Sequence, residues 1–172
     1  KPLKLRILDF VKENVFGSVA YKNLTHEDDE DALGRQFRQT RHELRIRLEY
    51  KGPLVGSLSL YSEVDAFIDD DDYSDRLVQT VRNDEARRAI VNFNELYLLQ
   101  AVGPLDIRAG FQTFAWGTGD LQNPTDNLNP RDLSDLFDSR KMGVLALRTN
   151  LYLLGFNLEG VFVPFFTPNR LP

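Results

Sequence analysis

The residues from Glu43 to Tyr50 alternate strictly between charged and apolar side chains, apart from the closing tyrosine. Successive side chains of a β-strand point to opposite faces of a sheet, so this stretch would carry its charges on one face only. An α-helix repeats about every 3.6 residues and would scatter the same charges around its surface. The stretch therefore predicts a strand with one charged and one apolar face.

The rest of the chain is predicted as further strands in an antiparallel, all-β, up-and-down meander. Apolar and polar residues also alternate in 54–66, 105–114 and 141–153, whereas 87–101 has a mixed pattern. Neither period fits 4–21 well, so it is predicted as a strand, with a short helix at its start as the alternative. The predicted strands, about seven in all, cover residues 4–21, 36–50, 54–66, 87–101, 105–114, 141–153 and 156–163.

Long and short connections alternate between these strands. The short ones are 51–53, 102–104 and the turn at Gly155, and the long ones are about 22–35, 67–86 and 115–140. Alternate connections of a meander lie at opposite ends of its sheet, so all long loops would share one end. That asymmetry is typical of outer-membrane β-barrels, with the long loops outside. The clean strands reach the roughly 9–11 residues that a tilted membrane-spanning strand needs.

Composition excludes several other classes of protein. With 172 residues, a net charge of −5 and a mean hydropathy of −0.36, the chain has neither a basic surface for nucleic acid nor apolar runs for spanning helices. It has no cysteine, and its two histidines, His26 and His42, belong to no catalytic motif. We therefore expect no enzymatic activity and no cofactor.

The charged faces of the predicted strands would line the lumen of a barrel. Such a lining can select and orient an ionic or sugar-like solute, or its charges can simply pair with one another across strands. Structural pairing is the favoured reading, with solute contact by a subset. The candidate lumen-lining residues are Glu43, Arg45, Arg47, Glu49, Glu63, Asp65, Arg108, Arg148 and Glu159.

Two acidic loops carry weaker candidates. Asp69, Asp70, Asp71 and Asp72 could bind a hard cation such as Ca²⁺, but the spacing is not that of an EF-hand, so a solvated loop is the better interpretation and no metal is expected. The loop after Phe111 is predicted to fold into the lumen or over its mouth. Its candidate residues are Trp116, Asp120, Asp126, Arg131 and Asp132.

Aromatic residues lie near the predicted strand ends, where membrane barrels carry aromatic girdles. Tyr50, Tyr152 and Phe156 are near the short turns, and Phe67 and Phe114 are near the long loops, as is Trp116. We interpret them as two girdles at the membrane surfaces.

Three motifs resemble an uncharacterised family of Gram-negative outer-membrane barrels that is similar to alginate-export porins. They are FAWGTGD at Phe114–Asp120, NPTDNLNPRD at Asn123–Asp132 and VFVPFFTPNRLP at Val161–Pro172. The resemblance implies that residues 1–172 are the N-terminal part of one longer barrel domain. It also implies an outer-membrane location and a channel or exporter role.

The expected function is passage or export of a polar or charged solute, which could be a polysaccharide, through a porin-like channel. The expected partners are outer-membrane lipid, that solute and envelope proteins, without nucleic acid. A structural barrel in an envelope assembly and a soluble lipocalin-like ligand-binding barrel are the alternatives. Because single-chain bacterial barrels have even strand counts, further strands are expected after residue 172.

Overall fold

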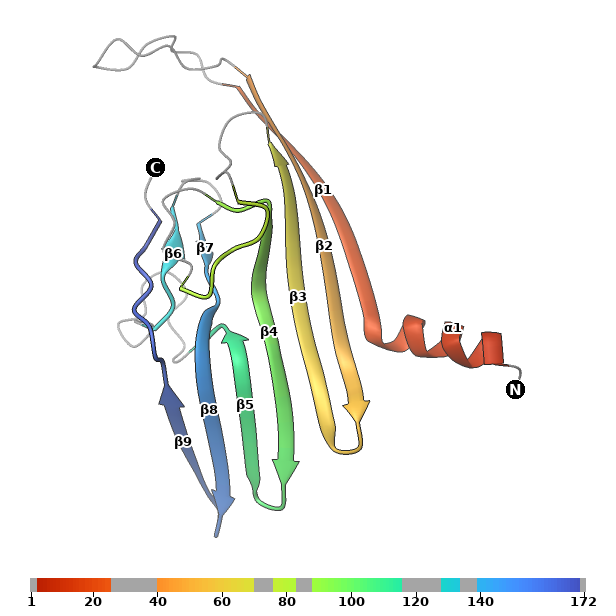
Figure 1. Ribbon diagram of the computed structural model, residues 1–172, viewed down its shortest axis with the longest axis vertical. Helices are drawn as coiled ribbons and strands as arrows, with labels where there is room; N and C mark the ends of the chain where they lie inside the picture. Colours follow the sequence, from red (N-terminus) through yellow and green to blue (C-terminus); the bar gives the residue numbers. More distant parts are fainter. Residues whose placement is uncertain are drawn as a thin grey trace.

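The computed structural model describes residues 3–25, 40–69, 76–82, 88–115, 128–133 and 139–170, and every structural statement below concerns these residues. One helix, α1, precedes an all-β body (Figure 1). The elements are α1 (Leu3–Asn14), β1 (Val15–Thr25), β2 (Thr40–Val55), β3 (Leu58–Asp69), β4 (Val91–Val102), β5 (Leu105–Gln112), β6 (Arg131–Asp132), β7 (Arg140–Lys141), β8 (Val144–Leu153) and β9 (Phe156–Phe162).

The strands form one antiparallel, up-and-down sheet, as the sequence predicts. Its seven strands have the order β1-β2-β3-β4-β5-β8-β9, and β6 and β7 pair separately within the connection from β5 to β8. Short turns at 56–57, 103–104 and 154–155 lie at one end, and the strand ends that lead into the longer connections lie at the other (Figure 1). The predicted seven-stranded antiparallel meander is confirmed. Within the described residues the sheet is open, with β1 and β9 as its two edges.

Two predicted boundaries are wrong. Residues 3–14 are a helix, which was the alternative for the start of the first segment. The turn predicted at 51–53 lies instead at Gly56 and Ser57, because β2 continues to Val55 and accommodates Pro53 beside a break in its register with β3. Gly56 has a φ of 59°, a conformation that glycine adopts without the steric cost of a side chain.

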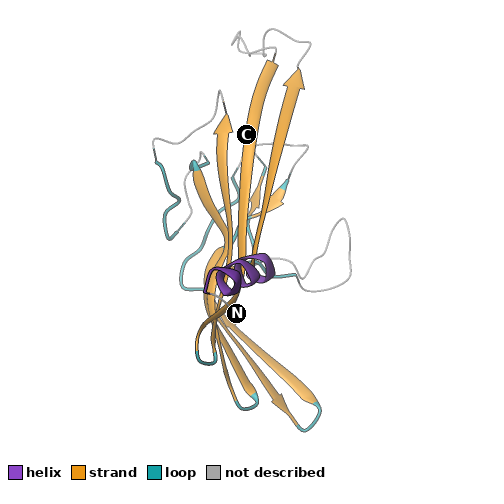
Figure 2. Cartoon of the chain, turned by 90° about the vertical axis from the view of Figure 1, so that its right-hand side faces the viewer, coloured by secondary structure: helices purple, strands orange, loops and turns teal. Residues whose placement is uncertain are grey.

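The two faces of the sheet differ in what covers them. We call the face that carries Glu43, Arg47 and their register partners Asp69 and Asp65 the inner face, and the opposite one, which carries Leu48, the outer face. Segments 76–82, 128–133, 139–143 and 164–170 gather at the loop end (Figures 1 and 2). At this end Arg88 and Arg140 form ion pairs with Glu43 and Asp65 of the inner face.

Burial follows polarity in the opposite sense to that of a water-soluble protein. On the inner face Asp65 is 0% exposed and Asn150 is 3% exposed, whereas on the outer face Leu48 is 57% exposed and Leu147 is 42% exposed. The register places the predicted apolar faces of these strands on the outer side and the predicted charged faces on the inner side. A soluble barrel with an apolar ligand inside requires the reverse arrangement.

The girdle interpretation is wrong for three of its aromatic residues. Phe67 and Phe114 are buried on the inner side, and Tyr152 shares the inner face of β8 with Arg148 and Asn150. The guanidinium groups of Arg88 and Arg140 lie 4.6 and 5.5 Å from the centre of the Phe67 ring. Phe114 packs in a small apolar cluster with Val144. The rings of Phe67 and Phe114 therefore support the segments at the loop end.

Candidate functional site

An ion-pair cluster on β2, β3 and β4 forms the centre of the inner face. Arg47 donates from Nε and from a terminal nitrogen to the two carboxylate oxygens of Asp65, at 2.7 and 2.9 Å, and it also lies 3.0 Å from Glu63. The side-chain amide of Asn94 donates to both acids, at 3.0 and 2.9 Å. Asn94 can reach them because it is the extra residue of a β-bulge in β4 opposite Glu63 and Val64.

A second set of ion pairs links the inner face of the sheet to the segments at the loop end. Arg88 lies 3.1 Å from Glu43 of β2 and 3.3 Å from Asp132 of β6, so one guanidinium joins the two. Asp132 also accepts a 2.7 Å hydrogen bond from Arg170, which is itself buried. From β7, Arg140 lies 3.5 Å from Asp65.

Asn129 attaches the segment before β6 to the ends of β5 and β8 through both the oxygen and the nitrogen of its side-chain amide. Its Oδ1 accepts a hydrogen bond from the main-chain N–H of Phe114. Its Nδ2 donates to the carbonyl oxygens of Gln112 and Met142, at 3.2 and 2.9 Å. Asn129 is buried, so no water replaces these bonds at the surface, and the side chain fixes where the loop returns to the sheet.

The second motif of the resemblance contacts the third through residues near the end of each. The main-chain N–H of Arg131 donates to Oδ1 of Asn169 at 2.8 Å, and the N–H of Arg170 donates to the carbonyl of Arg131 at 3.0 Å. The N–H of Leu133 in turn donates to the carbonyl of Arg170 at 2.8 Å. Residues 170 and 132 form a parallel bridge, so residues 169–170 continue the small β6–β7 sheet.

A small cavity lies where these segments meet the wall. Its volume is about 30 Å³, and its lining includes Arg88, Arg140, Lys141 and Arg170 beside Asp132. Burial, together with the positive charges of Arg45 and Arg88, lowers the pKa of Arg140 to about 10, so it stays protonated at neutral pH. Pockets for small molecules measure about 300–1,000 Å³, so this cavity has room for water but not for a transported solute.

Nearer the short turns, the inner face carries a different group of side chains. Arg108 and Arg148 lie directly opposite each other on β5 and β8, and Arg148 pairs with Glu159 of β9 at 3.0 Å. The Arg108 guanidinium lies 5.9 Å from the centre of the Tyr97 ring, which stacks on Tyr61 with a 5.0 Å centroid distance. The Arg148 guanidinium also lies 5.6 Å from the centre of the Phe114 ring, and the side chains of Arg148 and Glu159 are 21% and 24% exposed, so this half of the inner face is only partly covered.

The structure places all nine candidate lumen-lining residues on the inner face. It brings Glu43, Arg47, Glu63, Asp65, Arg148 and Glu159 into ion pairs, as the pairing interpretation predicts, and Glu49 lies 3.5 Å from Lys51. Arg131 and Asp132 lie at the loop end as predicted. Trp116, Asp120, Asp126, Asp70, Asp71 and Asp72 lie outside the described residues.

Sequence reasoning missed four residues that organise the loop end, namely Arg88, Asn129, Arg140 and Arg170. Asn129 and Arg170 fall inside the motifs of the resemblance, so those motifs were the available signal. Arg88 and Arg140 flank the ends of long loops, where no periodicity marks the face of a residue. Arg88 lies 45 positions after its partner Glu43 in the chain, and Arg140 lies 75 positions after its partner Asp65. Only the fold brings the members of each pair together.

No protein-family model, curated protein or solved structure matches the chain. Where the chain is described, no helix is long and apolar enough to cross a membrane. In the same residues, no cluster of three or more His, Asp or Glu side chains could hold a metal ion. The resemblance to outer-membrane barrels therefore stays a prediction.

Proposed function

We propose that this chain forms part of the wall of an outer-membrane β-barrel channel through which a polar or charged solute passes. The observation that carries the proposal is the inverted burial of the sheet, with charged and amide side chains covered and leucines exposed. Leu48, Leu98, Leu147 and Leu158 are all exposed on the outer face. A bilayer core is the environment in which such a face is stable, because lipid replaces the missing protein core.

The separation of the connections supports the same proposal. Turns of two residues lie at one end, and connections long enough to hold β6, β7 and segment 76–82 lie at the other. Strands β1 to β4 have 11, 16, 12 and 12 residues and β8 has 10, which reach the roughly 9–11 residues needed to cross a bilayer at a tilt, whereas β5 and β9 are shorter, with 8 and 7. The edges of β1 and β9 would pair with further strands to close the barrel, because unpaired backbone groups are not tolerated in lipid.

The charged inner face gives the solute class. Arg108, Arg148 and Glu159 line the inner face nearer the short turns, where they are partly exposed, beside the stacked pair Tyr61 and Tyr97. Charged and polar side chains on a pore wall select solutes by charge and replace their hydration. The ion pairs around Arg47 and Asp65 hold the wall together, which leaves the side chains nearer the short turns for solute contact.

Conductance in planar bilayers tests the proposal. We expect the purified protein to conduct ions, and we expect Arg108→Glu to shift the reversal potential in a KCl gradient toward cation selectivity, because it reverses a charge on the wall. The control is Ser57→Glu, which adds a negative charge in a turn outside the wall and should leave the reversal potential unchanged. Absence of both conductance and solute flux in the reconstituted protein would overturn the channel proposal.

A further inference from the structure

Helix α1 does not continue the wall but leaves it sideways. Figure 1 shows α1 extending away from the lower end of β1, across the direction of the strands, and Figure 2 shows the same crossing from the side. The helix joins β1 without a break, since α1 ends at Asn14 and β1 begins at Val15. This is the strand end nearer the short turns.

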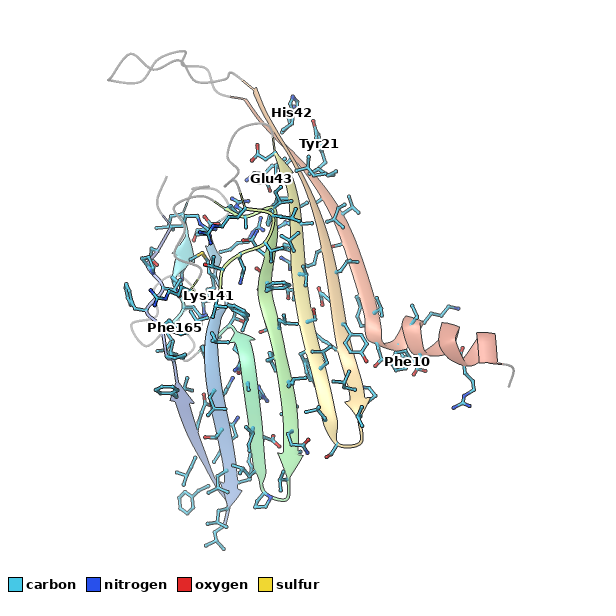
Figure 3. All side chains as sticks on the ribbon, viewed as in Figure 1. Phe10, Tyr21, His42, Glu43, Lys141 and Phe165 are labelled. Atoms are coloured by element: carbon cyan, nitrogen blue, oxygen red, sulfur yellow. The ribbon has the colours of Figure 1, made fainter. Side chains whose placement is uncertain are left out.

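Two contacts place the last turn of α1 against the outer face. The Phe10 ring lies 6.2 Å from the ring of Tyr50, and Tyr50 shares its face with Leu48 and Ile46 (Figure 3). The Asn14 side chain lies against Gly52, where an added Cβ would overlap with it, and Gly52 also belongs to the outer face. The helix is therefore anchored on the apolar side of the sheet and not on the charged side.

Asn14 also contacts the preceding turn of the helix. Its side-chain amide donates a 2.8 Å hydrogen bond to the carbonyl of Phe10. The Asn14 side chain therefore contacts both the last turn of α1 and Gly52 of β2.

The apolar side of α1 is left uncovered. Phe10 is 43% exposed and Val11 is 44% exposed, although both are large and apolar. In the sequence, Leu3, Ile7, Phe10 and Val11 have the spacing of one helical face, although Leu5 and Leu8 fall outside it, and Arg6, Lys12 and Glu13 are exposed polar residues. A helix with this pattern that lies across the strands has the form of an interfacial membrane helix.

We propose that α1 lies in the surface of the phospholipid leaflet on the short-turn side, with Phe10 and Val11 in its apolar layer. The proposal rests on the proposed function, because the outer face of the sheet must itself face lipid. The uncovered side of α1 is continuous with that face through Phe10 and Tyr50, so one lipid leaflet covers both. Arg6 and Lys12 then lie among the phosphate headgroups, where basic side chains are favourable.

Quenching of tryptophan fluorescence by brominated phospholipid acyl chains tests this placement. Trp116 is the only natural tryptophan, so a Trp116→Phe background makes each introduced tryptophan a single reporter. The reporters are Phe10→Trp and Val11→Trp for the apolar side of α1, Glu13→Trp for its polar side and Leu48→Trp for the outer face of the sheet. All are measured in the full chain folded into phosphatidylcholine and phosphatidylglycerol vesicles, with and without bromine on the acyl chains.

We expect loss of fluorescence in brominated vesicles for Phe10→Trp, Val11→Trp and Leu48→Trp, with little loss for Glu13→Trp. Quenching of Leu48→Trp without quenching of either apolar-side reporter would overturn the placement of α1 and leave the proposed function standing. Equal quenching of Glu13→Trp and Phe10→Trp would also overturn it, because an interfacial helix has two unlike sides. Absence of quenching at Leu48→Trp would contradict the proposed function itself.

Discussion

Asp65 shows how the inner face stays folded although its charges are buried. It is 0% exposed, yet it receives two hydrogen bonds from Arg47 and one from Asn94. A buried carboxylate is tolerated only when its oxygens are hydrogen-bonded in this way. Removal of one residue of a buried ion pair leaves the charge of the other without compensation. Arg148 and Glu159 form a pair on the same face whose side chains are 21% and 24% exposed, so water solvates them in part.

We therefore predict that Asp65→Ala lowers the free energy of unfolding by about 1–3 kcal/mol, because it removes a buried carboxylate to which Arg47 and Asn94 both donate hydrogen bonds. Glu159→Ala, the matched change in the more exposed pair, should cost about 0–1 kcal/mol. Urea unfolding of the protein in lipid vesicles measures both. A further Arg47→Met change in the Asp65→Ala protein should recover part of the loss, and equal costs for the two alanine variants would contradict this account.

The faces of individual strand residues could be predicted from the sequence, but their partners could not. Alternation that is strict in 43–50 and looser in 141–153 indicates which side chains share a face, because a strand has a period of two. It does not say that Arg88 and Arg140, which come from loop ends, supply charges to Glu43 and Asp65. Those contacts depend on how long loops return to the sheet, and no local pattern encodes that.

At the scale of elements, the pairing of β4 with β5 depends on Gly110. Its φ is 136°, a conformation that side chains disfavour, and an added Cβ would overlap with the carbonyl oxygen of Leu96 and the Cα of Tyr97. Because Gly110 has no side chain, the backbones of β4 and β5 can approach each other at Tyr97, the register partner of Gly110. Glycines at such positions let a sheet bend as a barrel wall must.

We predict that Gly110→Ala sharply lowers the yield of folded protein in vesicles, because β4 and β5 must separate to accommodate the methyl group. Gly56→Ala is the control, since Gly56 also has a positive φ of 59° but has no atom within 4 Å of an added Cβ. That change should cost only the conformational term of about 1–2 kcal/mol. The folded fraction can be read from the heat-modifiable mobility that barrels show on gels, and equal yields for the two variants would count against the close-approach argument.

Two elements show why some boundaries could not be predicted. Lys51, Gly52 and Pro53 have the composition of a turn, yet β2 runs through them because the bulge near Pro53 keeps its missing N–H out of the ladder and Gly56 supplies the turn. Residues 3–14 form a helix although their apolar residues fit neither period well, because the contacts of Phe10 and Asn14 with β2 hold the helix in place. In both cases tertiary contacts decided between local alternatives.

At the scale of the whole molecule, the open sheet has two unlike surfaces and two unlike ends. The inner face is charged and partly covered by the segments at the loop end, and the outer face is apolar and exposed. Tyr21 and His42 lie on the outer face at the loop end, joined by a 2.6 Å hydrogen bond between the hydroxyl and Nδ1 (Figure 3). Polar aromatic groups suit the edge of a bilayer, so in the proposed channel this pair would lie at one membrane surface and Tyr50 at the other.

The alternation of lipid and water along a single strand tests the central claim most directly. The chain has no cysteine, so single cysteines can be introduced along β8 and spin-labelled in the protein folded into vesicles. We predict that labels at the outer-face positions 145, 147, 149 and 151 are more accessible to lipid-soluble oxygen than to an aqueous nickel complex, and that the partly exposed inner-face positions 148 and 152 show the reverse. A profile without this two-residue alternation, or with water on the leucine face, would contradict the account of the sheet as a membrane wall.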